Sequence, residues 1–146
     1  MEIVALSPST LRQTALLMVL LWPRHSLEEM EGDLEALLQD PQQIVFVALD
    51  ETGKALGFAQ AALRHDYVEG ASFSPTAYLE GIFVLEEQRH KGIGRALLGQ
   101  VEGWALEQNC SQLASDCEIG NSLSLLFHLG SGFWETNRIV TFLKDL

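Results

Sequence analysis

A glycine-containing turn separates two apolar segments of this chain and limits the folds that it can adopt. Residues 86–98 read EEQRHKGIGRALL, so Gly92 and Gly94 follow the apolar segment TAYLEGIFVL at 76–85. The segment after the turn, 92–108, carries its apolar residues at helical spacing: Ile93, Ala96, Leu97, Val101, Trp104 and Ala105. The pattern predicts a buried strand, a glycine turn and an amphipathic helix in direct succession.

Such a turn has two interpretations. Unpaired backbone N–H groups at a helix start carry the positive end of the helix dipole, and glycines let a phosphate approach them closely. The chain lacks the GxxxxGK(S/T) pattern of ATP-binding loops and the GxGxxG pattern of dinucleotide-binding loops. It has Arg89-x-x-Gly92-x-Gly94 instead. The segment therefore predicts either an anion site of another kind or a plain strand–helix turn with basic side chains.

The remaining elements follow from hydrophobic spacing and from turn residues. Ser7 as N-cap and Pro8 as first helical residue predict the start of a helix. This helix is expected to end near Leu21, before Pro23. A second helix is expected to begin near Ser26. The other expected elements are strands at 2–6, 43–49, 55–67, 111–117 and 133–144 and a short helix at 121–130. Helices and strands alternate only in the second half, which favours a mixed sheet in an α/β (α+β) fold over a fully parallel one.

Length and charge narrow the class of protein. The 146 residues suit one domain. The net charge is −11, whereas a nucleic-acid-binding protein needs a basic surface. A polycationic partner would be attracted, although an acidic surface can also serve solubility alone. No apolar run reaches the roughly 20 residues of a membrane span, and no secretory signal is recognisable. Cys110 and Cys117 are expected to be reduced, in a cytoplasmic protein without a metal site.

The turn carries a resemblance to a known family. QRHKGIGRA at 88–96 resembles the acetyl-coenzyme A pyrophosphate loop of the GCN5-related N-acetyltransferases, whose pattern is Arg/Gln-x-x-Gly-x-Gly/Ala at a strand–helix junction. The expected element order also resembles that fold, as one acetyltransferase domain over 1–146 with acetyl-CoA as cofactor. The resemblance implies backbone contacts of Ile82, Phe83 and Val84 with the pantetheine arm. It further implies a cofactor contact of Asn121, which could equally be a helix N-cap, and a pyrophosphate loop made of Arg89, His90, Lys91, Gly92, Ile93, Gly94, Arg95 and Ala96.

Further segments resemble one branch of that superfamily, the aminoglycoside 6'-N-acetyltransferases. They are LWPRHS, LRHDYVEG with SPTAYLEGIFV, EGWALEQNCSQLASD, and GFWETNRIVTFLK. Aminoglycosides are polycations, so carboxylates suit their site. Glu80 also stands out by itself, because a carboxylate without a partner is costly in an apolar strand. The substrate contacts that the resemblance implies are Trp22, His25, Tyr67, Glu80, Asp116 and Glu135.

Each of these residues has a plainer alternative. Trp22 and Tyr67 could be packing aromatics, and Glu135 could be a solvated strand residue. The resemblance names Asp116 as the first choice for the general base and Glu80 as the second. A backbone N–H near Val84 would polarise the thioester oxygen. The last helix has no Tyr to serve as general acid, so that role stays open.

The implied reaction is direct attack of the 6'-amine on acetyl-CoA in a ternary complex, with antibiotic resistance as the consequence. Relatives often form homodimers through their last strands, so a homodimer is expected. Two other functions remain open: acetylation of another amine, such as a polyamine or a peptide N-terminus, and a non-catalytic acyl-CoA-binding module. The glycine loop fits all three functions. The residues expected to contact the acceptor amine favour acetylation of an aminoglycoside.

Overall fold

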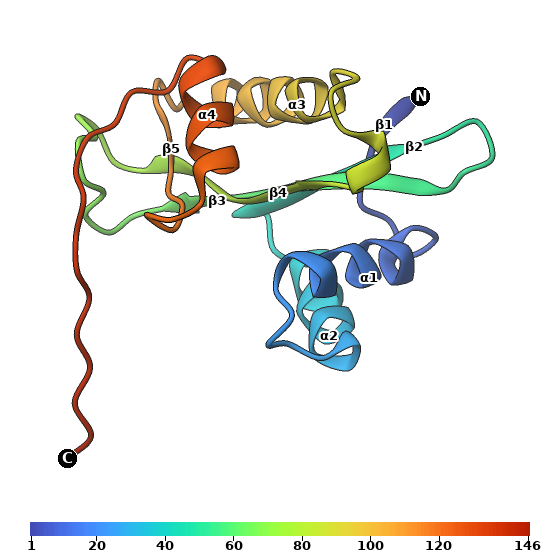
Figure 1. Cartoon of the computed structure of the whole chain (residues 1–146), viewed down its shortest axis with the longest axis horizontal. Helices are drawn as coiled ribbons and strands as arrows, with labels where there is room; N and C mark the ends of the chain where they lie inside the picture. The colour runs from blue at the N-terminus through green and yellow to red at the C-terminus, as the bar shows by residue number, and fades with distance from the viewer.

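One mixed sheet organises the computed structural model, which describes residues 1–146 (Figure 1). Its strands lie in the order β1-β2-β3-β4-β5, with antiparallel pairing up to β4 and parallel pairing between β4 and β5. The prediction of a mixed, mostly antiparallel sheet flanked by helices is therefore confirmed. The strands are β1 (Glu2–Ala5), β2 (Gln43–Leu49), β3 (Ala55–Arg64), β4 (Thr76–Val84) and β5 (Leu113–Ser115).

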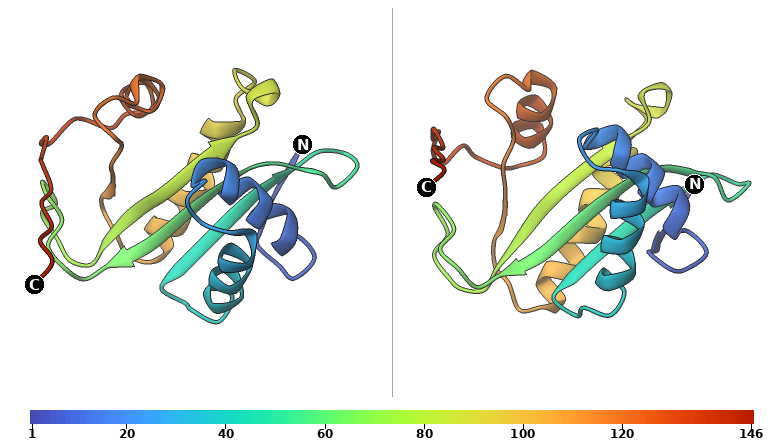
Figure 2. Two further views of the ribbon diagram at one scale, coloured as in Figure 1. Left: turned by 60° about the horizontal axis from the view of Figure 1, so that its bottom comes forward. Right: turned by 90° about the horizontal axis from the view of Figure 1, so that it is seen from below.

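Helices cover both faces of this sheet. Helices α1 (Leu11–Leu21) and α2 (Leu27–Leu37) lie on one face, and α3 (Ile93–Glu107) lies on the other (Figure 2). Successive strand residues point to opposite faces of the sheet and belong to two hydrophobic cores. Phe58 packs toward α1 and α2, while Ala59 packs toward α3. Helix α4 (Ser122–Gly130) contacts the start of α3, because Nη2 of Arg95 donates a hydrogen bond to the carbonyl of Gly130 at 2.6 Å. None of the helices is both long and apolar enough to span a membrane.

The two N-terminal helices test the predicted start signals. Helix α2 begins directly after Ser26, as expected, and the Ser26 side chain caps it by accepting a hydrogen bond from the N–H of Glu29 at 3.1 Å. The predicted start of α1 at Ser7 and Pro8 is wrong. The carbonyl of Ser7 accepts hydrogen bonds from the N–H and the hydroxyl of Thr10 at 3.1 and 3.2 Å, which closes a turn. The helix therefore begins only at Leu11.

Strands β4 and β5 separate after a short pairing. They pair at only three positions, the last being Leu79 with Ser115, so the strand predicted at 111–117 is reduced to 113–115. Beyond Leu79, β4 continues to Val84 with β3 on one side and no strand on the other. We call the point of separation the fork. Helix α4 lies on the α3 side of it (Figure 1).

The strand predicted at 133–144 is absent. Residues 133–146 form no helix or strand and extend away from the sheet toward the C-terminus (Figure 1). Their apolar side chains from Trp134 onward are exposed, including Phe142 at 92% and Leu143 at 97%. The composition of this segment favours a strand, but a strand needs a partner whose N–H and C=O groups complete its ladder. Residues 133–146 pair with no strand of this chain.

Candidate functional site

The glycine turn forms an open cradle at the start of α3. Gly92 directly precedes the helix with a φ of +85°, a left-handed conformation that glycine adopts without steric cost. A Cβ atom added to Gly92 would meet nothing within 4 Å, so the space in front of the turn is free. Arg89 and Lys91 are exposed beside it. Free N–H groups, the helix dipole and two cations make this turn suitable for an anion.

Next to the turn lies the unpaired edge of β4. Ile82, Phe83 and Val84 pair with β3 on one side only. Arg89 reaches back, and its Nε donates a hydrogen bond to the carbonyl of Val84 at 2.8 Å, which fixes the turn against the strand. An edge of this kind can accept an extended chain that carries amide groups. The turn and the strand edge thus adjoin.

A cluster of four polar side chains occupies the fork. Glu80 is the extra residue of a β-bulge, because Gly81 pairs with Gln60 while Leu79 pairs with Ala61. Its carboxylate accepts two hydrogen bonds from Arg64 on β3, at 3.0 Å from Nε and 2.7 Å from Nη2. We call Arg64, Tyr78, Glu80 and Asp116 the fork cluster. The apolar strand therefore does hold a partnered carboxylate, and its partner is a residue that the sequence analysis missed.

Tyr78 joins the two halves of the fork cluster. Its hydroxyl donates a hydrogen bond to the carboxylate of Asp116, and the Cζ of Arg64 lies 3.5 Å from the centre of its ring. Burial, followed by the bond to Asp116, raises the pKa of Tyr78 well above its ordinary value. The hydrogen bonds with Glu80 raise the pKa of Arg64. At neutral pH the cluster therefore combines two carboxylates with one fixed cation and a neutral phenol.

Trp22 and His25 lie on the α1–α2 side of the same sheet. The ring of Trp22 packs on the strand beside Glu80: a Cβ added to Gly81 would lie 2.5 Å from its Cζ2 atom. His25 bonds Glu29 through Nδ1 at 3.0 Å. A cavity of about 420 Å³ is lined by both residues, together with Asp33, Asp40 and Gln60. Asp33 and Asp40 add carboxylates that sequence reasoning assigned to no site.

Tyr67 and Glu135 lie on exposed segments outside the fork cluster. Tyr67 is 84% exposed, and its hydroxyl donates to Glu69 at 2.6 Å. Glu135 is paired with Arg138. The two segments adjoin, because the side chain of Asn137 donates to Glu69 at 3.4 Å. The structure thus brings Tyr67 and Glu135 near each other, but it shows no contact of either with Glu80 or Asp116.

The last helix has its own internal partners. The side chain of Asn121 accepts a hydrogen bond from the N–H of Ser124 at 3.1 Å and so caps α4. His128 bonds the carbonyl of Ser124 at 2.7 Å through Nδ1 and the hydroxyl of Ser115 at 2.8 Å through Nε2. The carbonyl of Leu79 in turn accepts a bond from that hydroxyl at 3.2 Å. These bonds hold α4 to the fork.

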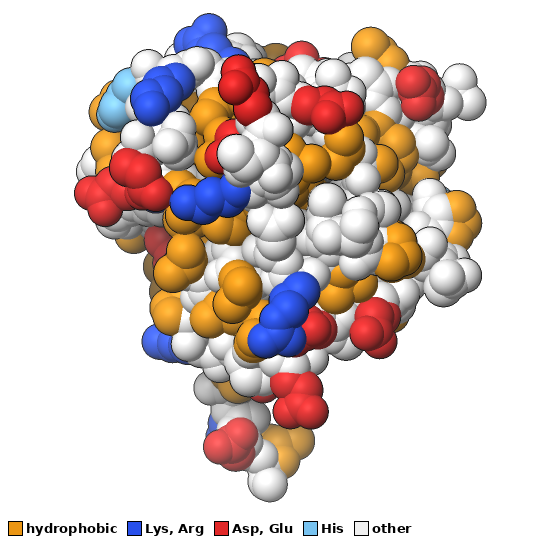
Figure 3. Space-filling model, turned by 90° about the vertical axis from the view of Figure 1, so that its right-hand side faces the viewer, with side chains coloured by type: hydrophobic (Ala, Val, Ile, Leu, Met, Phe, Trp, Pro, Cys, Tyr) orange, Lys and Arg blue, Asp and Glu red, His pale blue; other side chains and the backbone are white.

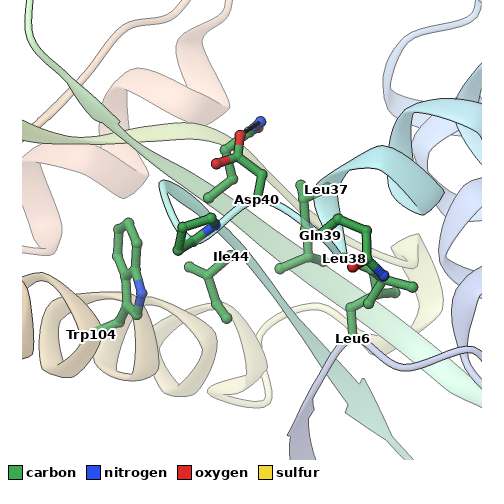
Figure 4. Close-up of a pocket in the computed structure, with 10 residues that line it drawn as sticks. Leu6, Leu37, Leu38, Gln39, Asp40, Ile44 and Trp104 are labelled. Atoms are coloured by element: carbon green, nitrogen blue, oxygen red, sulfur yellow. Dashed lines mark hydrogen bonds between the residues drawn. The ribbon is translucent and has the colours of Figure 1, made fainter.

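The structure also has a cavity away from the fork cluster. A cavity of about 440 Å³ lies between the end of α2, β2 and Trp104 of α3, and none of the predicted site residues lines it (Figure 4). On the face drawn in Figure 3, basic and acidic side chains are interspersed, so the net negative charge does not form one continuous field there. Nowhere do three His, Cys, Asp or Glu side chains gather in a way that could hold a metal ion.

Comparison with known proteins decides the family. Residues 14–133 match the model of the acetyltransferase (GNAT) family. A curated aminoglycoside N(6')-acetyltransferase type 1 from Serratia marcescens is 42% identical over 86% of both chains. One from Acinetobacter baumannii is 38% identical over 100% of this chain and 99% of its own. The chain belongs to the GNAT acetyltransferase family.

Solved structures of this family superpose closely on the chain. AAC(6')-Iy, in complex with the bisubstrate analog CoA-S-monomethyl-acetylneamine, gives a TM-score of 0.94 at 36% identity, covering 99% of this chain and 98% of that one. AAC(6')-Ih from Acinetobacter baumannii gives 0.93 at 37% identity with the same coverage. The predicted GNAT fold is therefore confirmed, and the glycine turn and β4 edge are parts of that fold.

Proposed function

We propose that this GNAT domain transfers the acetyl group of acetyl-CoA to the 6'-amine of aminoglycosides. The observation that carries the proposal is the pair of carboxylates, Glu80 and Asp116, held at the fork directly beside the free edge of β4. A polycationic substrate needs such carboxylates, because each can pair with a protonated amine. The names of the relatives support the same substrate class.

The glycine turn and the β4 edge fit acetyl-CoA. The pyrophosphate would be held by the free N–H groups of the turn, with Arg89 and Lys91 as counter-charges. The amides of the pantetheine arm would pair with the backbone of Ile82, Phe83 and Val84. When bound, acetyl-CoA supplies an activated acyl group. We expect the reaction to take place in the cytoplasm, where acetyl-CoA is made.

The acceptor amine must be neutral to attack, so a base has to take its proton. Asp116 is that base, directly or through a water, and Glu80 is the second candidate. The amine nitrogen forms a bond to the acyl carbon and the carbon–sulfur bond breaks, with the thiolate as leaving group. A backbone N–H of β4 near Val84 stabilises the developing charge on the acyl oxygen. Positioning of both substrates supplies much of the acceleration.

The exposed C-terminal segment supports a homodimer. Residues 133–146 carry strand-forming apolar side chains that this chain leaves uncovered, including Ile139, Val140 and Phe142. In a dimer, these residues would pair with a strand edge of the second copy, because they reach none in their own chain. Light scattering tests this: wild type is expected at twice the chain mass, and a Val140→Asp, Phe142→Asp variant at the chain mass. Monomeric wild type would contradict the proposal.

The test of the substrate class compares three amines. Purified protein is incubated with acetyl-CoA and with neomycin, spermidine or a peptide with a free N-terminus, and thiol release is followed. We expect release with neomycin at a kcat/KM at least tenfold above the others. Preference for spermidine or for the peptide would select another amine acetyltransferase. Coenzyme A binding without release in any mixture would indicate a non-catalytic module. Expression in a susceptible bacterium should raise its tolerance to neomycin.

A further inference from the structure

Arg64 is a cation at the centre of a site that is proposed to bind cations. Its guanidinium holds both oxygens of Glu80 and lies over the ring of Tyr78. Arg64 pairs with Thr76 across β3 and β4, and its side chain runs along β4 to reach Glu80. Its side chain is 41% exposed, against 25% for Glu80, so the pair adjoins solvent. A substrate amine that reaches Glu80 therefore meets Arg64 as well.

The charge of the site matters because binding and reaction need different forms of the amine. Amines of this kind are mostly protonated at neutral pH, and carboxylates bind that form. The protonated amine has no lone pair with which to attack. A site with two carboxylates and no cation would therefore bind the substrate tightly in its unreactive form.

We propose that Arg64 is a positioning residue that orients Glu80 and, through its own positive charge, favours the neutral form of the bound amine. The charged or titratable groups that act on Arg64 are Glu80 and Tyr78 from β4 and Asp116 from the end of β5. With Tyr78 neutral, the fork cluster has a net charge of −1 with Arg64 and −2 without it. This inference rests on the proposed acetylation of a cationic amine.

The test replaces Arg64 and follows the pH dependence of kcat, which reports the ionisation of the bound complex. Arg64→Gln removes the charge and is expected to move the acid limb of the kcat profile upward by about one to two pH units. That is the effect of one charge several Å away at the effective dielectric of a protein surface. The KM for neomycin is expected to stay constant or fall. A purely structural role of Arg64 would lower kcat at every pH without moving the limb.

Three further variants separate charge from geometry. Arg64→Lys keeps the charge without the two-pronged geometry, so its acid limb should stay within about half a pH unit of wild type. Arg12→Gln removes a cation from the exposed pair with Glu31 on the helical side and should change nothing. The double variant Arg64→Gln, Glu80→Gln has the same cluster charge as wild type. It leaves no unpaired charge in the strand, so it guards against a failure of the single variant to fold.

The outcomes are distinguishable from those of the proposed function. An unshifted limb in Arg64→Gln, or an equal shift in Arg64→Lys, would overturn the inference while neomycin turnover by wild type still supported the function. If wild type acetylates spermidine and not neomycin, the function fails and the same comparison is made with spermidine. Turnover of neither amine would overturn both. A double variant whose limb returns to the wild-type position would support the charge effect.

Discussion

The hydroxyl of Tyr78 donates a hydrogen bond to the carboxylate of Asp116 across the fork between β4 and β5. The two residues come from neighbouring strands, since Tyr78 pairs with Ala114, two positions before Asp116. The bond holds the proposed base where the strands separate. One carboxylate oxygen is occupied by the phenol, which leaves the other for an incoming amine.

Replacement of Asp116 tests its role as the base. Asp116→Asn removes the proton acceptor but keeps an oxygen that Tyr78 can bond, so kcat should fall about 10²- to 10⁴-fold with little change in melting temperature. Thiol release with neomycin measures it, with Asp145→Asn at the exposed C-terminus as control. Full activity in Asp116→Asn together with a large loss in Glu80→Gln would transfer the role of base to Glu80.

Tyr78 should make the protein sensitive to alkaline pH. Its pKa is raised in the folded state, first by burial, so its contribution to stability is complete below about pH 10 and is lost as the pH rises toward the folded-state value. The decline is expected to be at most about 1.4 kcal/mol per pH unit above pH 10. Urea unfolding between pH 8 and 11 should show a shallower decline in Tyr78→Phe than in wild type. Equal declines would refute this linkage.

Two glycines near and in α3 should respond to alanine in opposite directions. Gly92→Ala forces a side chain into a left-handed conformation and should cost about 1–2 kcal/mol, with weaker binding of acetyl-CoA. Gly99→Ala lies inside the helix with nothing within 4 Å and should stabilise by about 0.5–1 kcal/mol. Thermal unfolding and calorimetric titration with acetyl-CoA measure both effects. A neutral Gly92→Ala would contradict the cradle geometry.

Arg89 should contribute to cofactor affinity in two ways. It brings charge to the turn, and its bond to Val84 fixes the turn against β4. Arg89→Ala is expected to weaken acetyl-CoA binding about tenfold, roughly 1.4 kcal/mol, and to reduce the salt dependence of binding. Arg24→Ala, an exposed residue between α1 and α2, serves as control. An unchanged dissociation constant in Arg89→Ala would remove this residue from the cofactor site.

Local patterns in the sequence predicted the turn and Glu80 but not the partners of Glu80. The turn is a local feature, since Gly92 lies between a strand and a helix that are each recognisable from the spacing of their apolar residues. Glu80 stood out because its burial needed a partner. That partner, Arg64, comes from another strand, and its reach depends on a bulge whose position only the paired register reveals. No sequence pattern marks Tyr78, because its hydrogen bond to Asp116 depends on the pairing of β4 with β5.

Two of the errors in the predicted fold have a common cause. Ser7 and Pro8 carry the residue types of a helix start, and residues 133–144 carry those of a strand. In both places the outcome depends on hydrogen-bonding partners. The backbone of Ser7 is bonded to Thr10, and residues 133–144 have no strand beside them. Residue type indicates what a segment can form, whereas available hydrogen-bonding partners decide whether it does.

Neomycin and paromomycin carry an amine and a hydroxyl, respectively, at the 6' position, so a comparison of the two tests acetylation of the 6'-amine. Thiol release from acetyl-CoA is measured for each with the purified wild-type protein. Acetylation of the 6'-amine predicts rapid release with neomycin and none above background with paromomycin. Equal release with both would contradict the 6' assignment, and release with neither would contradict aminoglycoside acetylation itself.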